Sequence, residues 1–179
     1  FRSDFSAWTS FLFLNTHIAP FDNPDVRKAI NFAVDRDKIV ELVGGKSFAE
    51  PTCQILPPNF PGYRRYCPYT ANVSADGMYH GPDFVRASAL VDRSGTRGMT
   101  VTVSSPWDNA PSLAAAHYVA RVLTRLGFRA RFALSTDDNY FSAAKPARIG
   151  VALGAMGYPA PPPGSGMLRW NTGPAGRYG

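Results

Sequence analysis

The pattern of apolar and polar positions divides the chain into strands that alternate with helices. Aromatic and apolar residues dominate Trp8 to Leu14, which predicts a strand that ends at the following Asn-Thr pair. The segments Met99 to Ser105 and Arg129 to Leu134 alternate between apolar and polar residues, as strands do. The apolar segment Ile149 to Leu153 predicts one more strand, which we expect to be buried.

Four segments carry apolar residues at the spacing of amphipathic helices. Asn23 is a good N-cap for the first helix, and we interpret Asp35-Arg36-Asp37 as the cap of the second with a local ion pair. Gly44-Gly45 then provide a left-handed stop. The third helix starts at Gly81-Pro82-Asp83, and the fourth runs from Pro111 to Leu126. The expected core positions are Val26, Ala29, Ile30, Ala33 and Val34; Ile39, Leu42 and Val43; Phe84, Ala87, Leu90 and Val91; and Leu113, Ala116, Val119, Ala120, Leu123 and Leu126.

The order of elements indicates the fold class. From Pro82 onward the order is helix, strand, helix, strand, strand, with one further helical turn expected at Tyr140 to Ala144. This order favours an α/β unit with at least one right-handed parallel crossover. After Tyr158 the chain is rich in Pro and Gly, so we expect residues 161–179 to form an irregular tail.

Composition and charge limit the classes of protein to which this chain can belong. The chain has 179 residues, of which 45% are hydrophobic, and this is enough for one well-buried domain. It contains no apolar run of about 18 residues, so we expect no membrane span. The net charge is +6, but Lys and Arg are spread along the chain without a dense run, and we expect no nucleic-acid partner. Because the chain opens on Phe1, we interpret it as a fragment or a processed chain.

The two cysteines, Cys53 and Cys67, lie in the segment PTCQILPPNFPGYRRYCPYT. This loop has no His or acidic residue at metal-ligand spacing, which argues against zinc. We favour a disulfide that pins the loop 51–70, and a disulfide implies an oxidising, extracellular compartment. The alternative is two buried free thiols in a cytosolic protein.

No combination of residues in the sequence is typical of a catalytic site. His17, His80 and His117 lie far apart, and we find no Cys, Asp or Glu at a ligand spacing from them. Ser165 lies in the Pro-rich tail and lacks the strand and helix of a nucleophile elbow. The pair Asp137-Asp138 is interpreted as a turn cap. We therefore expect no enzyme activity, no metal and no cofactor.

Two aromatic residues lie where strands end. Trp107 follows the strand at Met99 to Ser105, and Tyr158 follows the strand near Ile149. Because α/β sheets bind ligands beyond the carboxyl ends of their strands, we expect Trp107 and the turn formed by Met156, Gly157 and Tyr158 to lie together at a ligand site. The alternative is that both aromatic residues only cover the edge of the core.

The stretch LNTHIAPFDNPDVRKAINFAVDRDKIVELVGG, followed by LPPNFPGY, resembles a known family. It is similar to the extracellular solute-binding proteins of family 5, which serve ABC importers of peptides, nickel and related solutes. Their pattern has the form N-T-x-x-x-P-F-D-x-x-x-V-R-x-A-(I/L)-x-x-A-(I/V)-D-R, then a helix, Gly-Gly and P-P-x-x-P-G-Y. The likeness resumes at ASALVDRSGTRGMTVTV and RVLTRLGFRARF, and it covers roughly residues 9 to 160.

The resemblance implies a fold and a function. It implies that residues 1–160 form one α/β lobe of a two-lobed, type II periplasmic-binding-protein-like fold, with a mixed sheet flanked by helices. Such a protein closes on a small solute, for example an oligopeptide, and delivers it to an ABC permease. The strand FLFLNT would then lead the backbone toward the ligand cleft. A stand-alone extracellular sensor that uses the same lobe without transport is the alternative function.

The resemblance also bears on location and solute. The pairing of CQILPP with YCPYT resembles versions from Gram-positive actinobacteria, where the protein is normally a lipoprotein on the outer face of the membrane and is expected to be a monomer. Peptide-binding members tend to carry Trp-x-x-Asp-Tyr-x-x-Pro after the last strand. Here Gly154 replaces the Trp and Gly157 the Asp, while Tyr158 and Pro161 remain. Because a buried ammonium without a counter-charge is costly, we expect a less cationic solute.

Overall fold

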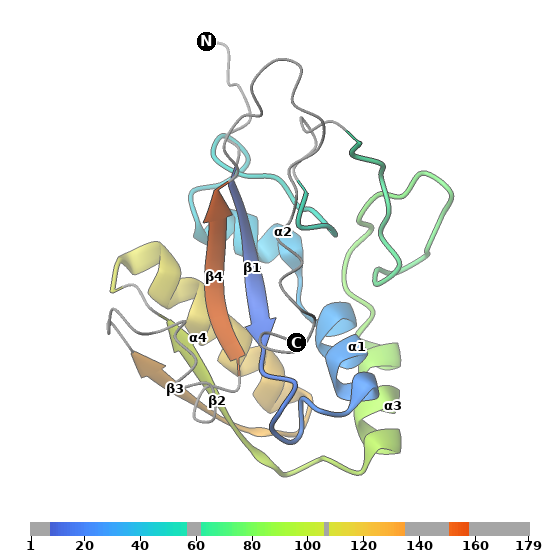
Figure 1. Cartoon of the computed structure of the whole chain (residues 1–179), viewed down its shortest axis with the longest axis vertical. Coiled ribbons are helices and arrows are strands. Elements are labelled where there is room, and N and C mark those ends of the chain that lie inside the picture. The colour runs from blue at the N-terminus through green and yellow to red at the C-terminus, as the bar shows by residue number, and fades with distance from the viewer. Residues whose placement is uncertain (1–7, 57–61, 106–107, 135–150, 158–179) are drawn as a thin grey trace, which may run out of the picture.

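Four strands form a single mixed sheet in the computed structural model, which describes residues 8–56, 62–105, 108–134 and 151–157 (Figure 1). The strands are β1 (Trp8–Leu14), β2 (Thr100–Ser105), β3 (Arg129–Leu134) and β4 (Val151–Gly157), and their spatial order is β1-β4-β2-β3. The first three agree with the predicted bounds to within one residue. The fourth strand exists but extends to Gly157, beyond its predicted end at Leu153.

The strand pairing shows why β4 is longer than predicted. β1 and β4 are antiparallel over their whole lengths, from Trp8 opposite Gly157 to Leu14 opposite Val151. Each residue of β4 therefore has a ladder partner on β1, and this long-range pairing is not visible in the local sequence. On its other side β4 runs parallel to β2, which in turn runs parallel to β3. The parallel crossover expected from the order of elements is confirmed.

Each helix begins at a side chain that accepts a hydrogen bond from the first turn. The helices are α1 (Pro24–Ala33), α2 (Arg36–Leu42), α3 (Phe84–Ser94) and α4 (Ala110–Arg125). Their N-caps are Asn23, Asp35, Asp83 and Asn109. The Asn23 side-chain oxygen lies 2.8 Å from the Asp25 nitrogen, and that of Asp35 lies 3.0 Å from the Asp37 nitrogen. The two N-caps predicted from the sequence are confirmed.

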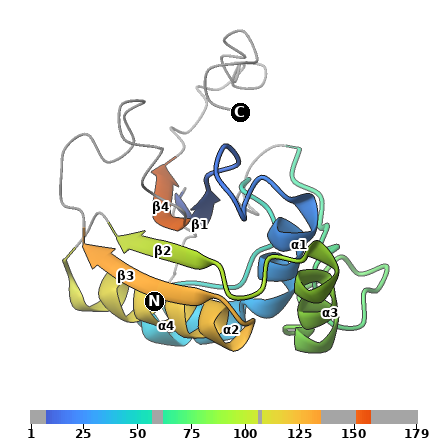
Figure 2. The ribbon, with the colours of Figure 1, turned by 90° about the horizontal axis from the view of Figure 1, so that it is seen from below.

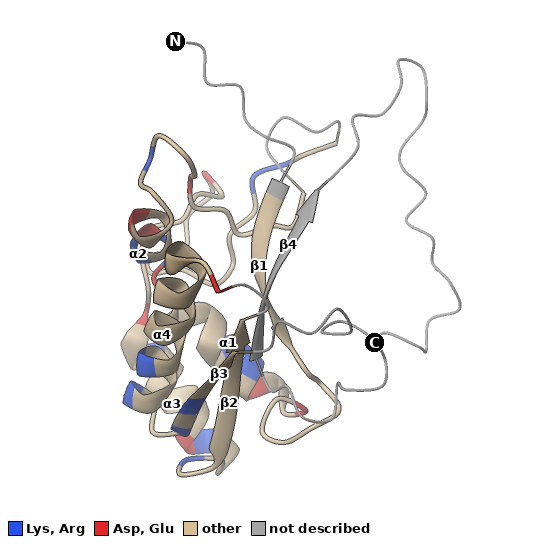
Figure 3. Ribbon diagram, turned by 90° about the vertical axis from the view of Figure 1, so that its left-hand side faces the viewer, with Lys and Arg blue, Asp and Glu red and all other residues tan. Residues whose placement is uncertain are grey.

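The helices are arranged on one side of the sheet. Figure 2 shows α4 beneath β2 and β3 with α2 beside it, while α1 and α3 pack against each other near the start of β2. Figure 3 shows the same layering from the side and shows Lys and Arg spread over several elements. In the described parts of the chain, no helix covers the other face of the sheet.

The core lies where the helices meet the sheet and each other. Its fully buried large side chains include Phe21, Ile30, Val91, Val103 and Leu123. The expectation for α2 holds only in part: α2 buries Val40, the half-buried Ile39 packs against the core, and Leu42 and Val43 are only half-buried. This short helix packs against α4 and not directly on the sheet, so only a narrow part of its surface is covered. Leu113 of α4, also expected in the core, is half-buried as well.

Among the helices that the structure describes, none is long and apolar enough to cross a membrane. The helical turn expected at residues 140–144 lies outside the described residues, and so do residues 161–179 of the expected tail.

Cys53 and Cys67 form a disulfide, which confirms the favoured prediction over two free thiols. Their Cα atoms are 5.1 Å apart, and the Cys67 side chain is buried. The segment between α2 and α3 has no helix or strand among its described residues, so it makes few backbone hydrogen bonds of its own. The disulfide therefore fixes a part of the chain that secondary structure does not hold.

We expect the double substitution Cys53→Ser and Cys67→Ser to lower the free energy of unfolding by about 3 kcal/mol. The reason is the lost constraint on a closed loop of this size in the unfolded chain. Urea denaturation of the variant and of the oxidised protein measures the difference. Chemically reduced and alkylated protein should match the variant; an unchanged unfolding midpoint in both would contradict the prediction.

Candidate functional site

The candidate site is the edge of the sheet at which β2 and β4 end. The two strands are parallel, with Val103 opposite Val151 and Ser104 opposite Ala152, so their carboxyl ends point the same way. β2 stops at Ser105, whereas β4 continues to Gly157. Crevices beyond the carboxyl ends of parallel strands are the usual ligand sites of α/β sheets.

The structure places two of the four predicted ligand residues. Met156 and Gly157 are the last two residues of β4, where they lie opposite Thr9 and Trp8 of β1. They belong to the strand and not to the turn that the sequence suggested, because their pairing with β1 keeps the backbone extended. Trp107 and Tyr158 lie outside the described residues. That all four lie together stays a prediction.

β1 runs antiparallel to β4, so its amino-terminal end lies at this edge. That the strand FLFLNT leads toward the ligand cleft, as the resemblance implied, stays a prediction. Asn15, which follows β1, lies toward the other end of the sheet. Its side-chain oxygen accepts a hydrogen bond from the His17 nitrogen at 3.1 Å, so it shapes the loop that leads to α1.

Buried hydroxyl groups at this edge were not predicted from the sequence. Ser104 and Ser105 end β2, and both are almost completely buried, as is Thr9 opposite Met156. Buried hydroxyl groups of this kind have partners within the protein, so they help to fix the ends of the strands. The local signal was the pair of consecutive serines in MTVTVSS, which breaks the apolar-polar alternation at the strand end.

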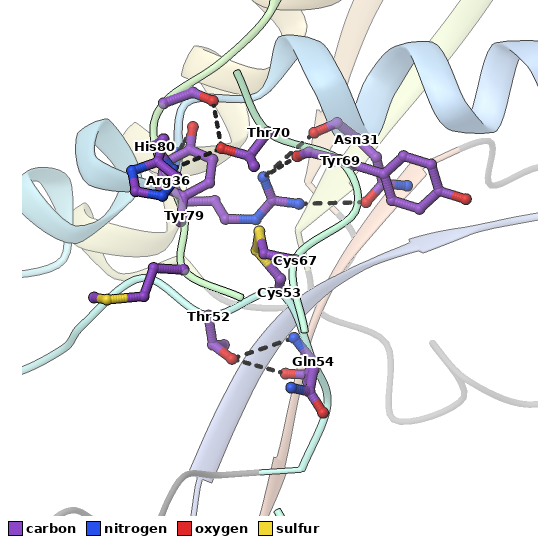
Figure 4. Close-up of a disulfide and its surroundings, with 12 residues drawn as sticks. Asn31, Arg36, Thr52, Cys53, Gln54, Cys67, Tyr69, Thr70, Tyr79 and His80 are labelled. Atoms are coloured by element: carbon purple, nitrogen blue, oxygen red, sulfur yellow. Dashed lines mark hydrogen bonds between the residues drawn. A yellow bond between two sulfur atoms is a disulfide. The ribbon is translucent and has the colours of Figure 1, made fainter. Parts of the chain in front are cut away.

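Arg36, the first residue of α2, anchors the irregular segment between α2 and α3 (Figure 4). Its guanidinium donates hydrogen bonds to the backbone oxygens of Asn31 at 3.3 Å and Tyr69 at 3.4 Å. It also lies over the Tyr79 ring, with 4.8 Å between the guanidinium carbon and the ring centroid. Arg36 thus joins α1 to Tyr69 and Tyr79, which both lie in the part of the segment that follows Cys67.

Burial determines the electrostatics of this anchor. Burial lowers the pKa of Arg36, and it raises the pKa of Tyr79 to about 12. The Tyr79 hydroxyl accepts a hydrogen bond from the Arg36 nitrogen at 3.1 Å and donates one to the Val34 oxygen at 3.3 Å. The ion pair expected within Asp35-Arg36-Asp37 is not formed in the described structure. The Arg36 side chain instead turns toward the carbonyl groups of Asn31 and Tyr69.

One histidine does have a carboxylate near it, contrary to the sequence analysis. His80 Nε2 lies 2.9 Å from Asp76 Oδ2 and 3.2 Å from Ser74 Oγ. The hydrogen bond from Ser74, together with one from the Met78 nitrogen, lowers the pKa of Asp76 to about 2. This is not a catalytic triad, because the carboxylate and the hydroxyl contact the same ring nitrogen, so the ring cannot relay a proton between them.

The described residues contain no group of three or more His, Cys, Asp or Glu that could hold a metal ion.

Comparison with protein families identifies the chain. The model of the bacterial extracellular solute-binding proteins, family 5 Middle, matches residues 2–178. The chain belongs to this family, as its motifs indicated.

Curated relatives match a shorter part of the chain. The glutathione-binding protein GsiB of Escherichia coli is 25% identical over 122 residues, which is 68% of this chain and 22% of that protein. The same figures hold for the GsiB of Salmonella paratyphi A. The chain thus spans about a fifth of the length of these relatives.

Solved structures share the fold. Clavulanic acid biosynthesis oligopeptide binding protein 2 has a TM-score of 0.68 at 22% identity, over 85% of this chain and 28% of that chain. DppA of Helicobacter pylori, in complex with the peptide STSA, has a TM-score of 0.67 at 22% identity, over 86% and 28%. NikZ of Campylobacter jejuni, in complex with Ni(L-His), has a TM-score of 0.64 at 15% identity, over 88% and 31%. The fold is therefore that of type II periplasmic-binding-protein-like proteins, as expected.

We expect Arg36→Lys to lower the free energy of unfolding by about 1 to 3 kcal/mol, although the charge is kept. A lysine has no planar fork, so at least one of the buried carbonyl groups would lose its donor. Lys38→Arg on the exposed side of the same helix is the matched control and should have little effect. Urea denaturation measures both variants; equal effects would show that Arg36 is not an anchor.

Proposed function

We propose that this chain is part of an extracellular solute-binding protein that serves an ABC importer and takes a peptide or a related small solute. The observation that carries the proposal is the family match over residues 2–178. The fold shared with peptide-bound DppA supports it, and so does the name of the relative GsiB, a glutathione-binding protein.

Within this proposal, residues 1–160 form an α/β lobe that meets a second lobe of the full-length protein. The short span relative to GsiB supports this view. The solute would be held between the lobes at the edge where β2 and β4 end, and hinge closure would present it to a membrane permease. The protein would act outside the cell as a monomer, anchored to the membrane as a lipoprotein.

The residues at the end of β4 affect which solute the protein can bind. Gly154 and Gly157 are strand residues that lie opposite Phe11 and Trp8. Neither provides the carboxylate that peptide-binding members tend to place near an amino terminus. A solute whose ammonium is absent or remains in solvent would avoid the cost of an unpaired buried charge. We therefore expect N-acetylated peptides to bind at least as tightly as the same peptides with free amino termini.

Import and sensing predict different phenotypes. Deletion of the gene for the full-length protein should abolish uptake of its radiolabelled solute if the protein serves an importer. Uptake that persists without the protein, with solute binding intact in the purified protein, would favour the stand-alone sensor.

The isolated chain should bind the solute at least about tenfold more weakly than the full-length protein. Ligand sites bury most of the ligand surface, and one lobe alone leaves much of that surface in water. Isothermal titration calorimetry of both proteins against the same peptides measures the ratio. Equal affinities would contradict the two-lobed site, provided that circular dichroism shows the isolated chain to be folded.

Replacing Trp107 by Ala in the full-length protein should weaken solute binding by about 1 to 3 kcal/mol, a range typical of aromatic anchor residues. Trp107→Phe is the matched control, because it keeps a ring that can stack, and it should retain most of the affinity. Calorimetry measures affinity and thermal denaturation measures stability. A lower melting temperature with unchanged affinity would instead show that Trp107 covers the core.

A further inference from the structure

A second surface feature lies away from the sheet edge. A hollow of about 330 Å³ is formed by α1, α3 and the residues that follow Cys67. Figure 2 shows that β2 and β3 point away from α1 and α3, so the hollow lies on the opposite side from the carboxyl ends of these strands. Its volume is at the lower end of the range of sites for small molecules.

The hollow has a surplus of positive charge. Lys28 from α1 and Arg86 and Arg93 from α3 line it. Arg93 is paired with Asp25, with 2.9 Å between the Arg93 Nε and Asp25 Oδ2 atoms, and this hydrogen bond lowers the pKa of Asp25. Lys28 and Arg86 have no ion-pair partner among the described residues. Two of the three cations therefore form no direct ion pair, although the Lys28 charge also helps to lower the pKa of Asp25.

An aromatic pair holds one of these cations in place. The Arg86 guanidinium carbon lies 4.6 Å from the centroid of the Phe32 ring, which is buried. Phe32 in turn meets the Tyr69 ring edge to face, with 5.4 Å between the centroids. A cation over a ring is held without using its N–H donors. The Arg86 side chain makes no hydrogen bond to another described residue, so its planar fork can receive a carboxylate or phosphate.

The apolar side of the hollow is also fixed. Pro68 and Tyr69 form this side, directly after the buried, disulfide-bonded Cys67. The Tyr69 carbonyl is held by the Arg36 guanidinium at 3.4 Å. Rigid apolar surface next to unpaired cations is the arrangement that binds a molecule with an anionic group and an apolar body, because a rigid surface loses little conformational freedom on binding.

We propose that this hollow binds a small organic anion, with its carboxylate or phosphate against Arg86 and Lys28 and its planar apolar part against Tyr69 and Pro68. The site is separate from the proposed solute site at the sheet edge. It does not depend on the transport function, because the residues that form it lie on α1, α3 and the disulfide-linked segment alone.

The experiment uses the full-length protein and phenyl phosphate as the probe, titrated by isothermal calorimetry. We expect saturable binding at one site that is at least tenfold tighter than that of inorganic phosphate, and that weakens as NaCl is raised because the charges are exposed. The variants Arg86→Gln and Lys28→Gln should each weaken binding at least fivefold. Arg97→Gln and Lys38→Gln remove cations outside the hollow and should change nothing.

Several outcomes would overturn the proposal. Equal affinity for phenyl phosphate and inorganic phosphate would show that the apolar side contributes nothing. Unchanged affinity in Arg86→Gln, with the melting temperature also unchanged, would place the anion elsewhere. Binding of a phosphotyrosine peptide without binding of phenyl phosphate would identify a protein partner instead of a small molecule. Loss of phenyl phosphate binding in Trp107→Ala would show that the probe occupies the solute site at the sheet edge.

Discussion

The antiparallel pairing of β1 with β4 is the constraint on which the rest of this structure depends. It joins residues 8–14 to residues 151–157, so the first and last described segments of the chain lie side by side in one sheet. Because β4 also pairs with β2, the same contact connects the amino-terminal helices to the β2-α4-β3 unit. Closing so long a loop is entropically costly, and ladder hydrogen bonds along the full length of both strands offset this cost. The pairing also determines which strand ends meet at the candidate site.

The segment between α2 and α3 is held by a different means. It lacks helix and strand, and side chains supply the contacts that a ladder would otherwise make. The Cys53–Cys67 disulfide closes it, and Arg36 binds the Tyr69 carbonyl. Thr70, which is buried, accepts a hydrogen bond from the His80 nitrogen at 2.6 Å and donates one to the Gly81 oxygen at 3.0 Å. Irregular backbone can be as fixed as a strand when its polar groups are satisfied in this way.

The two candidate binding surfaces follow from these two constraints. Strand pairing creates the edge where β2 and β4 end, with buried hydroxyls at Thr9, Ser104 and Ser105. The anchored segment creates the other surface, because it holds Tyr69 against Phe32 beside α3. A fold shared with peptide-binding and nickel-binding proteins does not decide the solute; the groups at these surfaces do.

The sequence by itself determined the local structure and the family. The caps Asn23 and Asp35, the bounds of β1 and β3 and the disulfide were predicted correctly, because each depends on residues close together in the chain or on a pairing with few alternatives. Tertiary structure alone decided the place of β4 between β1 and β2, the direction of β1 and the partners of Arg36. It also brought Lys28 and Arg86 to one hollow. These depend on contacts between residues far apart in the chain, and such contacts leave no periodic pattern in the sequence.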